Sequence, residues 1–257
     1  MTLPVLPASF SRVPFAHRAL HDVSRGRPEN SRAAIRAAIA AGYGIEIDIQ
    51  LSRDGAAMVF HDYDLERLTG APGTVRLHDA QTLKATALRG ADEGIPDLAE
   101  VLALVAGRVP VLIELKDQDG AMGTHGGDAL ERATAQAVQG YAGDVAVMSF
   151  NPHMVARLQS LCPDVPRGIT TSAYRTGEWP LPQAVCDRLR DIPDFDRVGA
   201  SFISHEVDDL DRPRVADLRA AGAVICCWTV RSAAQEARAR HVAHNITFEG
   251  YAAELPA

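Results

Sequence analysis

Short β-branched runs alternate with alanine-rich stretches of helical length along the whole chain. The strand-like runs cover residues 15–18, 44–51, 57–61, 109–116, 145–150, 167–171, 200–204, 224–230 and 245–248. The helical stretches cover residues 31–41, 98–106, 128–141, 153–161, 183–190, 213–221 and 232–241. This alternation predicts βαβ units and a parallel sheet. Because the units continue to the C-terminus, the pattern favours a closed (β/α)8 barrel, or TIM barrel, over an open Rossmann-type sheet.

One irregular segment, at about residues 62–96, interrupts the alternation after an early strand. It is rich in residues that are typical of turns, namely Gly70, Pro72, Gly73, Gly90 and Gly94. We interpret it as a small insertion at the face of the barrel where strands end and where barrel enzymes build their active sites. The length of 257 residues suits a single catalytic barrel domain over residues 1–257.

Two acidic residues alternate with isoleucines in the run 45–49. Alternate residues of a strand share a face. The isoleucines are therefore expected to face covering helices, and Glu46 and Asp48 to face the barrel interior. Two inward carboxylates are costly unless something compensates their charge, and a divalent cation with oxygen ligands is the natural compensation.

The run 111–116 repeats this pattern, with Glu114 and Lys116 on the inward face. Glu114 would supply a third carboxylate for a hard metal ion, and Lys116 can bind a substrate anion. The alternative is that these residues are the solvated ends of ordinary strands. The same pattern on two strands favours the metal site.

Two histidines end strand-like runs, His17 beside Arg18 and His61 beside Asp62. Two imidazoles can divide the roles of general acid and general base near neutral pH. Arg18 carries a planar set of donors that matches phosphate. No catalytic role is expected for the other histidines, which lie in loops or on polar helix faces: His21, His78, His125, His153, His205, His241 and His244.

These residues belong to motifs that resemble, in order and spacing, the signature of the glycerophosphodiester phosphodiesterases. The motifs are Ala16-His17-Arg18, then RPENS at residues 27–31, GIEIDIQLSRDG at 44–55, VFHD at 59–62 and LERLTG at 65–70. The sequences IELK at 113–116 and WTV at 228–230 extend the match. The resemblance spans nearly the whole chain and is densest in the first seventy residues.

The resemblance implies a TIM barrel with a small insertion after the second strand and one bound divalent cation, Mg²⁺ or Ca²⁺. It implies these roles: metal ligation by Glu46, Asp48 and Glu114, acid–base catalysis by His17 and His61, and phosphate binding by Arg18 and Lys116. Glu29 is a weaker candidate for metal ligation. Trp228 would either line the substrate cleft or pack inside the barrel.

The chain departs from the family pattern at two places. Relatives usually carry glycine after the His-Arg pair, where this chain has Ala19. If the backbone needs a positive φ there, alanine costs about 1 kcal/mol. The last strand ends in Phe248-Glu249, where relatives often carry Thr-Asp, and no site role is assigned there.

The expected activity is hydrolysis of a glycerophosphodiester to glycerol 3-phosphate and an alcohol, through a cyclic phosphate. No serine or cysteine stands in a base-and-orienter arrangement, which disfavours a covalent enzyme intermediate. One alternative is a phosphodiesterase or lyase that acts on another phospholipid-type head group. Another is an inactive barrel that binds a phosphorylated ligand, which the full set of expected polar residues disfavours. A metal aldolase is a more distant alternative.

Composition narrows the partners and the location. Hydrophobic residues make up 47% and charged residues 23%, as in ordinary globular domains, and the net charge of -7 speaks against a nucleic-acid partner. The four cysteines are expected to be buried free thiols in a reducing compartment: Cys162, Cys186, Cys226 and Cys227. With no signal-peptide pattern and no membrane-length apolar run, we expect a cytoplasmic protein. The oligomeric state stays open, a homo-oligomer included.

Overall fold

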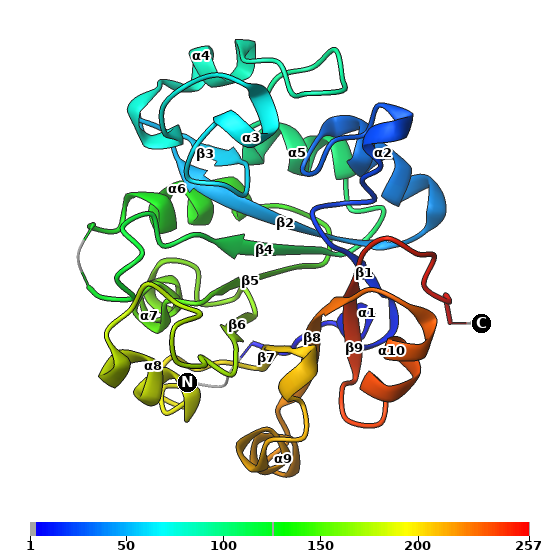
Figure 1. The fold of residues 1–257 in the computed structure, drawn as a ribbon, viewed down its shortest axis with the longest axis vertical. Coiled ribbons are helices and arrows are strands. Elements are labelled where there is room, and N and C mark those ends of the chain that lie inside the picture. Colours follow the sequence, from blue (N-terminus) through cyan, green and yellow to red (C-terminus); the bar gives the residue numbers. More distant parts are fainter. Residues whose placement is uncertain (1–3, 125, 257) are drawn as a thin grey trace.

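The computed structural model describes residues 4–124 and 126–256 and contains a closed parallel barrel (Figure 1). Its strands are β1 (Phe15–Ala16), β2 (Gly44–Leu51), β4 (Val111–Leu115), β5 (Val145–Ser149), β6 (Arg167–Thr171), β7 (Phe202–Glu206), β8 (Val224–Val230) and β9 (Asn245–Phe248). Strand β1 closes the barrel because it pairs in parallel with both β2 and β9. The prediction of a (β/α)8 barrel is confirmed.

The predicted helices are also present, with ends that differ from the predicted ones by a few residues at most. They are α2 (Arg32–Ala41), α5 (Leu98–Val105), α6 (Ala129–Val138), α7 (Pro152–Leu161), α8 (Gln183–Arg190), α9 (Pro213–Ala220) and α10 (Ala233–Ala239). Side-chain capping marks the start of α2, α5, α7 and α10. At the start of α2, for example, the side chain of Ser31 accepts a hydrogen bond from the backbone N–H of Ala34. Figure 1 shows the helices around the outside of the strands.

Apolar side chains pack on the outer side of the strands and also fill part of the barrel interior. The isoleucines of β2 lie in the apolar layer between strands and helices. Inside the barrel, a separate apolar cluster joins Phe15, Leu112 and Phe202 with Phe10 of the short helix α1 (Ser9–Arg12). Because this cluster fills one end of the interior, polar side chains are left for the end where the strands finish.

The run 57–61 contains a strand, as predicted, but the parallel arrangement expected for the alternating runs does not extend to it. Strand β3 (Ala57–Val59) pairs antiparallel with β2, outside the closed barrel. The connection is a tight hairpin in which Ser52 N–H bonds to the Ala56 carbonyl, and so short a connection cannot make a parallel crossover. The chain therefore folds back along β2, and Phe60 N–H bonds to the Asp48 carbonyl at 2.9 Å.

The predicted insertion is present and has a small core of its own. It carries α3 (Glu66–Thr69), a 3-10 helix (Val75–Leu77) and α4 (Ala80–Ala85). Met58, Phe60, Leu65, Leu83 and Ile95 are among the buried residues of its apolar cluster. The insertion therefore forms a compact wall beside the end of the barrel (Figure 1).

Gly168 on β6 lies directly against the ring of Phe202 on β7. A Cβ atom at this position would lie 2.3 Å from Cε2 of Phe202 on the neighbouring strand. We predict that Gly168→Ala destabilises the protein by roughly 1–3 kcal/mol, the usual effect of overpacking a core. Urea unfolding of Gly168→Ala in wild-type and Phe202→Leu backgrounds measures this. An equal loss in both backgrounds would contradict the steric explanation.

Candidate active site

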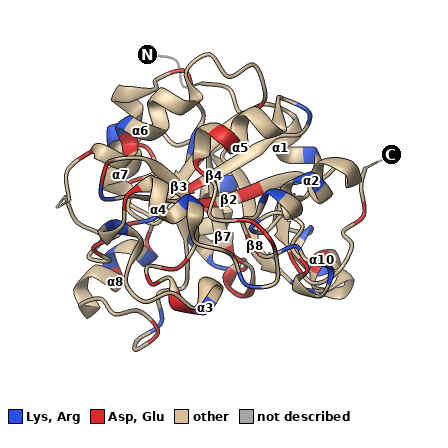
Figure 2. Ribbon diagram, turned by 90° about the horizontal axis from the view of Figure 1, so that it is seen from above, with Lys and Arg blue, Asp and Glu red and all other residues tan. Residues whose placement is uncertain are grey.

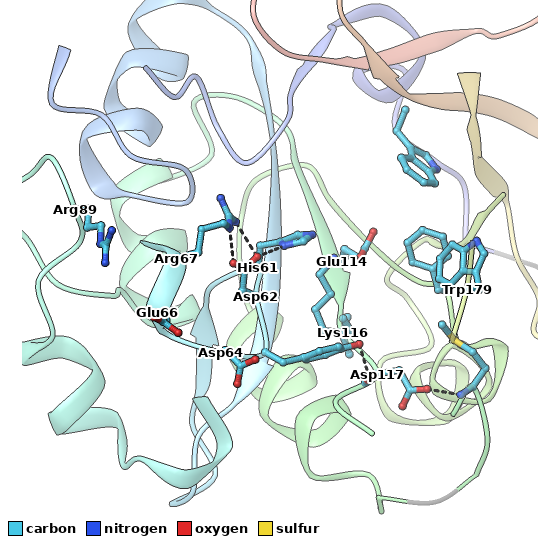
Figure 3. Close-up of a pocket in the computed structure, with 15 residues that line it drawn as sticks. His61, Asp62, Asp64, Glu66, Arg67, Arg89, Glu114, Lys116, Asp117 and Trp179 are labelled. Carbon is cyan, nitrogen blue, oxygen red and sulfur yellow. Dashed lines mark hydrogen bonds and ion pairs between the residues drawn. The ribbon is translucent and has the colours of Figure 1, made fainter. Parts of the chain in front are cut away.

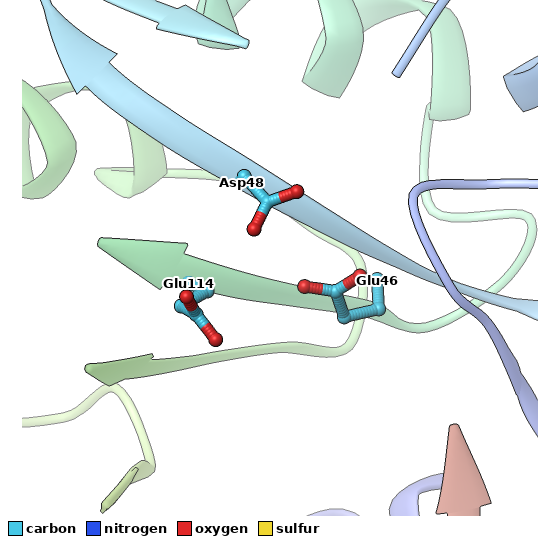
Figure 4. A group of neighbouring side chains, drawn as sticks. All are labelled: Glu46, Asp48 and Glu114. Carbon is cyan, nitrogen blue, oxygen red and sulfur yellow. The ribbon is translucent and has the colours of Figure 1, made fainter. Parts of the chain in front are cut away.

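Three carboxylates meet inside the barrel at the end where the strands finish. Glu46 and Asp48 come from β2 and Glu114 from β4, and Asp48 pairs in register with Glu114. Each is at most 5% exposed, and one oxygen of each lies within 4.8 Å of the others (Figure 4). Figure 2 shows these acidic segments of β2 and β4 in the middle of the molecule. The inward placement predicted from strand alternation is confirmed.

Burial and mutual repulsion dominate the electrostatics of this acidic cluster. Burial, with Asp48 and Glu114 nearby, raises the pKa of Glu46 well above its usual value. Burial also acts to raise the pKa of Asp48, but Lys116, His61 and Arg18 outweigh it and lower that pKa. The Nζ atom of Lys116 lies 2.7 Å from Asp48 Oδ1 and 2.5 Å from Glu114 Oε1.

The donor set fits a hard divalent cation. It consists only of carboxylate oxygens, which are the ligands that Mg²⁺ and Ca²⁺ prefer. Neighbouring groups orient two of the three carboxylates. The backbone N–H of Arg18 donates to Glu46 Oε2 at 2.9 Å, and the side-chain Nδ2 of Asn30 donates to Asp48 Oδ2 at 3.0 Å. Lys116 and Arg18 together neutralise only part of the charge of the three carboxylates, because Arg18 also pairs with Glu29. Sequence reasoning did not assign Asn30 to the site, although it belongs to the RPENS motif.

His17 lies between the barrel and a carboxylate that sequence reasoning missed. Its Nδ1 is 2.6 Å from Glu249 Oε2, and the other oxygen of Glu249 accepts from Arg231 Nε at 2.8 Å. Burial lowers the pKa of His17, while the hydrogen bond with Glu249 opposes this shift. No site role was assigned to Glu249 from the sequence, but the structure places its carboxylate in contact with His17. The sequence could have indicated this placement, because Glu249 directly follows the last strand and the ends of the strands form the active-site face of such barrels.

His61 has a similar arrangement. Its Nδ1 lies 2.7 Å from Asp62 Oδ1, and the same oxygen accepts from Arg67 Nη2 at 2.7 Å. Burial acts to raise the pKa of Asp62, but the hydrogen bonds from His61 and Arg67 lower it. The hairpin of β2 and β3, not a parallel strand, delivers His61 to the site. Both His61 and His17 act electrostatically to lower the pKa of Asp48.

Glu29 faces two arginines instead of the acidic cluster. One of its oxygens bonds to Arg18 and the other to Arg67. Arg18 is thereby held with its Nε 3.7 Å from Asp48 Oδ2. This Nε is buried and has no hydrogen-bond partner among the described residues, so it is a donor available beside the acidic cluster. Such a donor suits a phosphate oxygen.

The loop after β1 has an unusual backbone. Arg18, Ala19 and Asn30 have φ values of 53°, 63° and 60°, in the left-handed region that disfavours residues with a Cβ. The condition stated for Ala19, a positive φ at this position, is met. Strain of this kind is found preferentially at functional sites.

A cavity of about 900 Å³ opens beside the acidic cluster. Glu114, Lys116 and His61 line it, and Figure 3 shows Arg89 and Trp179 on opposite sides of Glu114 and Lys116. Trp228 also lines the cavity, so of its two expected placements the cleft is the observed one.

The remaining expectations from single residues have mixed outcomes. His21 lies 3.8 Å from Glu249, close to the site. The expected placement of His205 in a loop or on a polar helix face is wrong, because His205 is a buried residue of β7 that contacts Thr171 and Asp209. His125 lies outside the described residues.

All four cysteines are free and buried, as predicted. None of the helices in residues 4–124 and 126–256 combines the length and apolar character needed to cross a membrane.

Comparisons with known proteins agree with this geometry. The sequence model described as "Glycerophosphoryl diester phosphodiesterase family" matches residues 17–245. A glycerophosphodiester phosphodiesterase from Caldanaerobacter subterraneus subsp. tengcongensis is 31% identical over 165 residues, which span 61% of this chain and 66% of that protein. The putative glycerophosphodiester phosphodiesterase YhdW of Bacillus subtilis is 27% identical over 226 residues, 84% of this chain and 85% of the relative.

Solved structures share the fold. A phosphodiesterase from Oleispira antarctica, in complex with the product sn-glycerol-3-phosphate, matches with a TM-score of 0.75 and 22% identity over 94% of each chain. A glycerophosphodiester phosphodiesterase from Thermotoga maritima matches with a TM-score of 0.70 and 21% identity, over 92% of this chain and 94% of that one. Because the family model matches residues 17–245, which is most of the chain, the chain belongs to the glycerophosphoryl diester phosphodiesterase family.

Proposed function

We propose that this protein hydrolyses glycerophosphodiesters to glycerol 3-phosphate and an alcohol, with one divalent cation, Mg²⁺ or Ca²⁺. The observation that carries the proposal is a cluster of three buried carboxylates with two histidines near Asp48, each backed by its own carboxylate. His61 and Glu114 of this group line the cavity. Family membership and the names of the relatives support it. The substrate would be a small molecule that the enzyme meets in the cytoplasm.

Glu46, Asp48 and Glu114 would hold the cation. When bound, it would neutralise negative charge that develops around phosphorus and favour loss of the substrate's hydroxyl proton. Arg18 and Lys116 would bind the phosphate oxygens and stabilise the transition state electrostatically. Lys116 suits this role because its neighbours Asp48 and Glu114 outweigh the effect of burial and keep its pKa raised.

The two histidines would move the protons. In the first step, the substrate's 2-hydroxyl oxygen attacks phosphorus and the alcohol oxygen leaves, which gives a cyclic phosphate. One histidine takes the hydroxyl proton and the other protonates the leaving alcohol. In the second step, water opens the ring and the two histidines exchange roles. Glu249 and Asp62 would hold His17 and His61 through Nδ1, which leaves each Nε2 for the reaction.

The attacking group would come from the substrate and not from the protein. Burial raises the pKa of the Cys226 thiol to about 12, so this thiol stays protonated near neutral pH. Attack by the neighbouring hydroxyl benefits from an effective molarity on the order of 10⁵ M or more.

The first prediction from this proposal concerns the cation. Excess EDTA should abolish release of glycerol 3-phosphate, and Mg²⁺ or Ca²⁺ should restore it. Glu46→Gln should weaken metal binding, measured by calorimetry, roughly tenfold or more, since even groups outside the ligand set cost that much in metal sites. Asp217→Asn, which removes an exposed carboxylate on α9, is the control. Full turnover in EDTA would refute metal dependence.

The second concerns the histidines. His17→Ala and His61→Ala should each lower kcat roughly 10²-fold or more, the usual size of a general acid–base contribution. The double variant should lose much less than the product of the two, because both residues act in one reaction. The exposed His241→Ala is the matched control. A single variant with nearly wild-type kcat would exclude that histidine from the mechanism.

The third concerns Glu249 as a positioning residue. Glu249→Gln can turn an N–H toward His17 Nδ1 and stabilise the wrong tautomer, which lowered kcat severely in another histidine–carboxylate pair. We expect kcat to fall roughly tenfold or more while KM changes little, and Glu249→Asp to recover part of the loss. NMR of labelled His17 reports the tautomer directly. An unchanged tautomer and an unchanged kcat would remove Glu249 from the mechanism.

The fourth concerns the nucleophile. A substrate whose 2-hydroxyl is replaced by hydrogen should bind but turn over poorly, and bis(p-nitrophenyl) phosphate, which also lacks this hydroxyl, should be a weak substrate. Steady-state kinetics with the matched hydroxylated substrate measures the difference. Hydrolysis of the deoxy analogue at the normal rate would favour direct attack by water.

A further inference from the structure

Aromatic side chains wall one end of the active-site cavity. Phe150, Trp179 and Trp228 line it together with Met122, and the three aromatic residues are only partly buried. The ring centroids of Phe150 and Trp179 are 5.1 Å apart, and those of Phe150 and Trp228 are 5.4 Å apart. These residues come from β8 and from the segments that follow β4, β5 and β6, so the barrel itself holds the wall in place.

Two polar groups at this aromatic end are already satisfied within the protein. The indole N–H of Trp228 donates to the Ser204 carbonyl at 3.0 Å. Asp117 is 8% exposed, and its Oδ2 accepts from the Met122 N–H at 2.7 Å. Burial raises the pKa of Asp117 to about 6, and the carboxylate that remains at neutral pH is largely covered and faces the Met122 N–H. The aromatic end therefore offers mainly carbon surface to a ligand.

The opposite end of the cavity has a different character. Arg67 and Arg89 line it with Asp64 and Glu66 (Figure 3). The reacting groups Lys116 and Glu114 lie between the two ends, so a bound phosphodiester would reach toward both. The hydroxyl-rich glycerol suits the charged end and the cation. The aromatic end is then left for the alcohol on the other side of phosphorus.

We propose that the aromatic end binds the leaving alcohol and selects glycerophosphodiesters whose alcohol has an apolar body, such as an alkyl chain. This inference rests on the proposed function and names its substrate class. The volume of about 900 Å³ is that of sites for drug-sized ligands, which leaves room for such a group beside glycerol phosphate. Methylenes that enter the aromatic end lose contact with water, which favours binding in proportion to the area covered.

A homologous series of glycerophosphoalkanols tests the proposal. The ethyl, butyl and hexyl diesters have leaving alcohols of nearly equal acidity, so differences in kcat/KM report binding of the chain. Complete burial would raise kcat/KM about fourfold per methylene, and we expect a rise of roughly tenfold or more from ethyl to hexyl. A flat series would overturn the proposal.

Trp179→Ala locates the effect. It should lower the hexyl-to-ethyl ratio of kcat/KM severalfold, whatever its effect on the ethyl diester alone. Because the ratio is taken within one variant, loss of folded protein cancels. Leu181→Ala is the control, since Leu181 packs in the same apolar cluster but does not line the cavity. An unchanged ratio in Trp179→Ala would place the alkyl chain elsewhere and overturn the proposal.

A cationic alcohol is the competing occupant, because aromatic faces also attract quaternary ammonium groups. The choline diester and its neutral isostere, the 3,3-dimethylbutyl diester, separate the two. We expect the neutral diester to have the higher kcat/KM, and a preference for choline would overturn an apolar site. If no diester were hydrolysed, the proposed function would fail, and calorimetric affinities of the same series would still decide the character of the aromatic end.

Discussion

Three carboxylates buried within 4.8 Å of one another determine how the rest of this site is built. Desolvation and repulsion oppose their ionisation, as the raised pKa of Glu46 reflects. The surrounding chain supplies positive charge and donors: Lys116 from the end of β4, Arg18 from the loop after β1 and the amide of Asn30 before α2. That arrangement leaves an all-oxygen site for one more positive charge, which is why we assign a cation to it.

The closed barrel makes this concentration of charge possible. Apolar side chains around Phe15 and Phe202 fill the interior at one end, so the polar layer is confined to the other. There the cavity is bounded by the insertion on one side and by aromatic residues on the other. The same cavity thus has a charged end, a middle part lined by Glu114 and Lys116, and an apolar end.

Features with a local signal could be predicted from the sequence. The alternation in β2 and β4 identified Glu46, Asp48 and Glu114 because strand periodicity fixes the face of each residue. The direction of β3 could not be predicted from its composition, since an antiparallel hairpin and a parallel strand use similar residues. The contact between His17 and Glu249 joins residues 232 positions apart, and only closure of the barrel by β1 and β9 brings them together.

The cation site is the central claim, and anomalous diffraction from crystals soaked in Mn²⁺, with a Glu46→Gln crystal as the control, tests it most directly. Our account predicts one strong peak bounded by carboxylate oxygens of Glu46, Asp48 and Glu114, and a much weaker peak in the variant. A peak at another position, or no peak among these three side chains at saturating Mn²⁺, would contradict it.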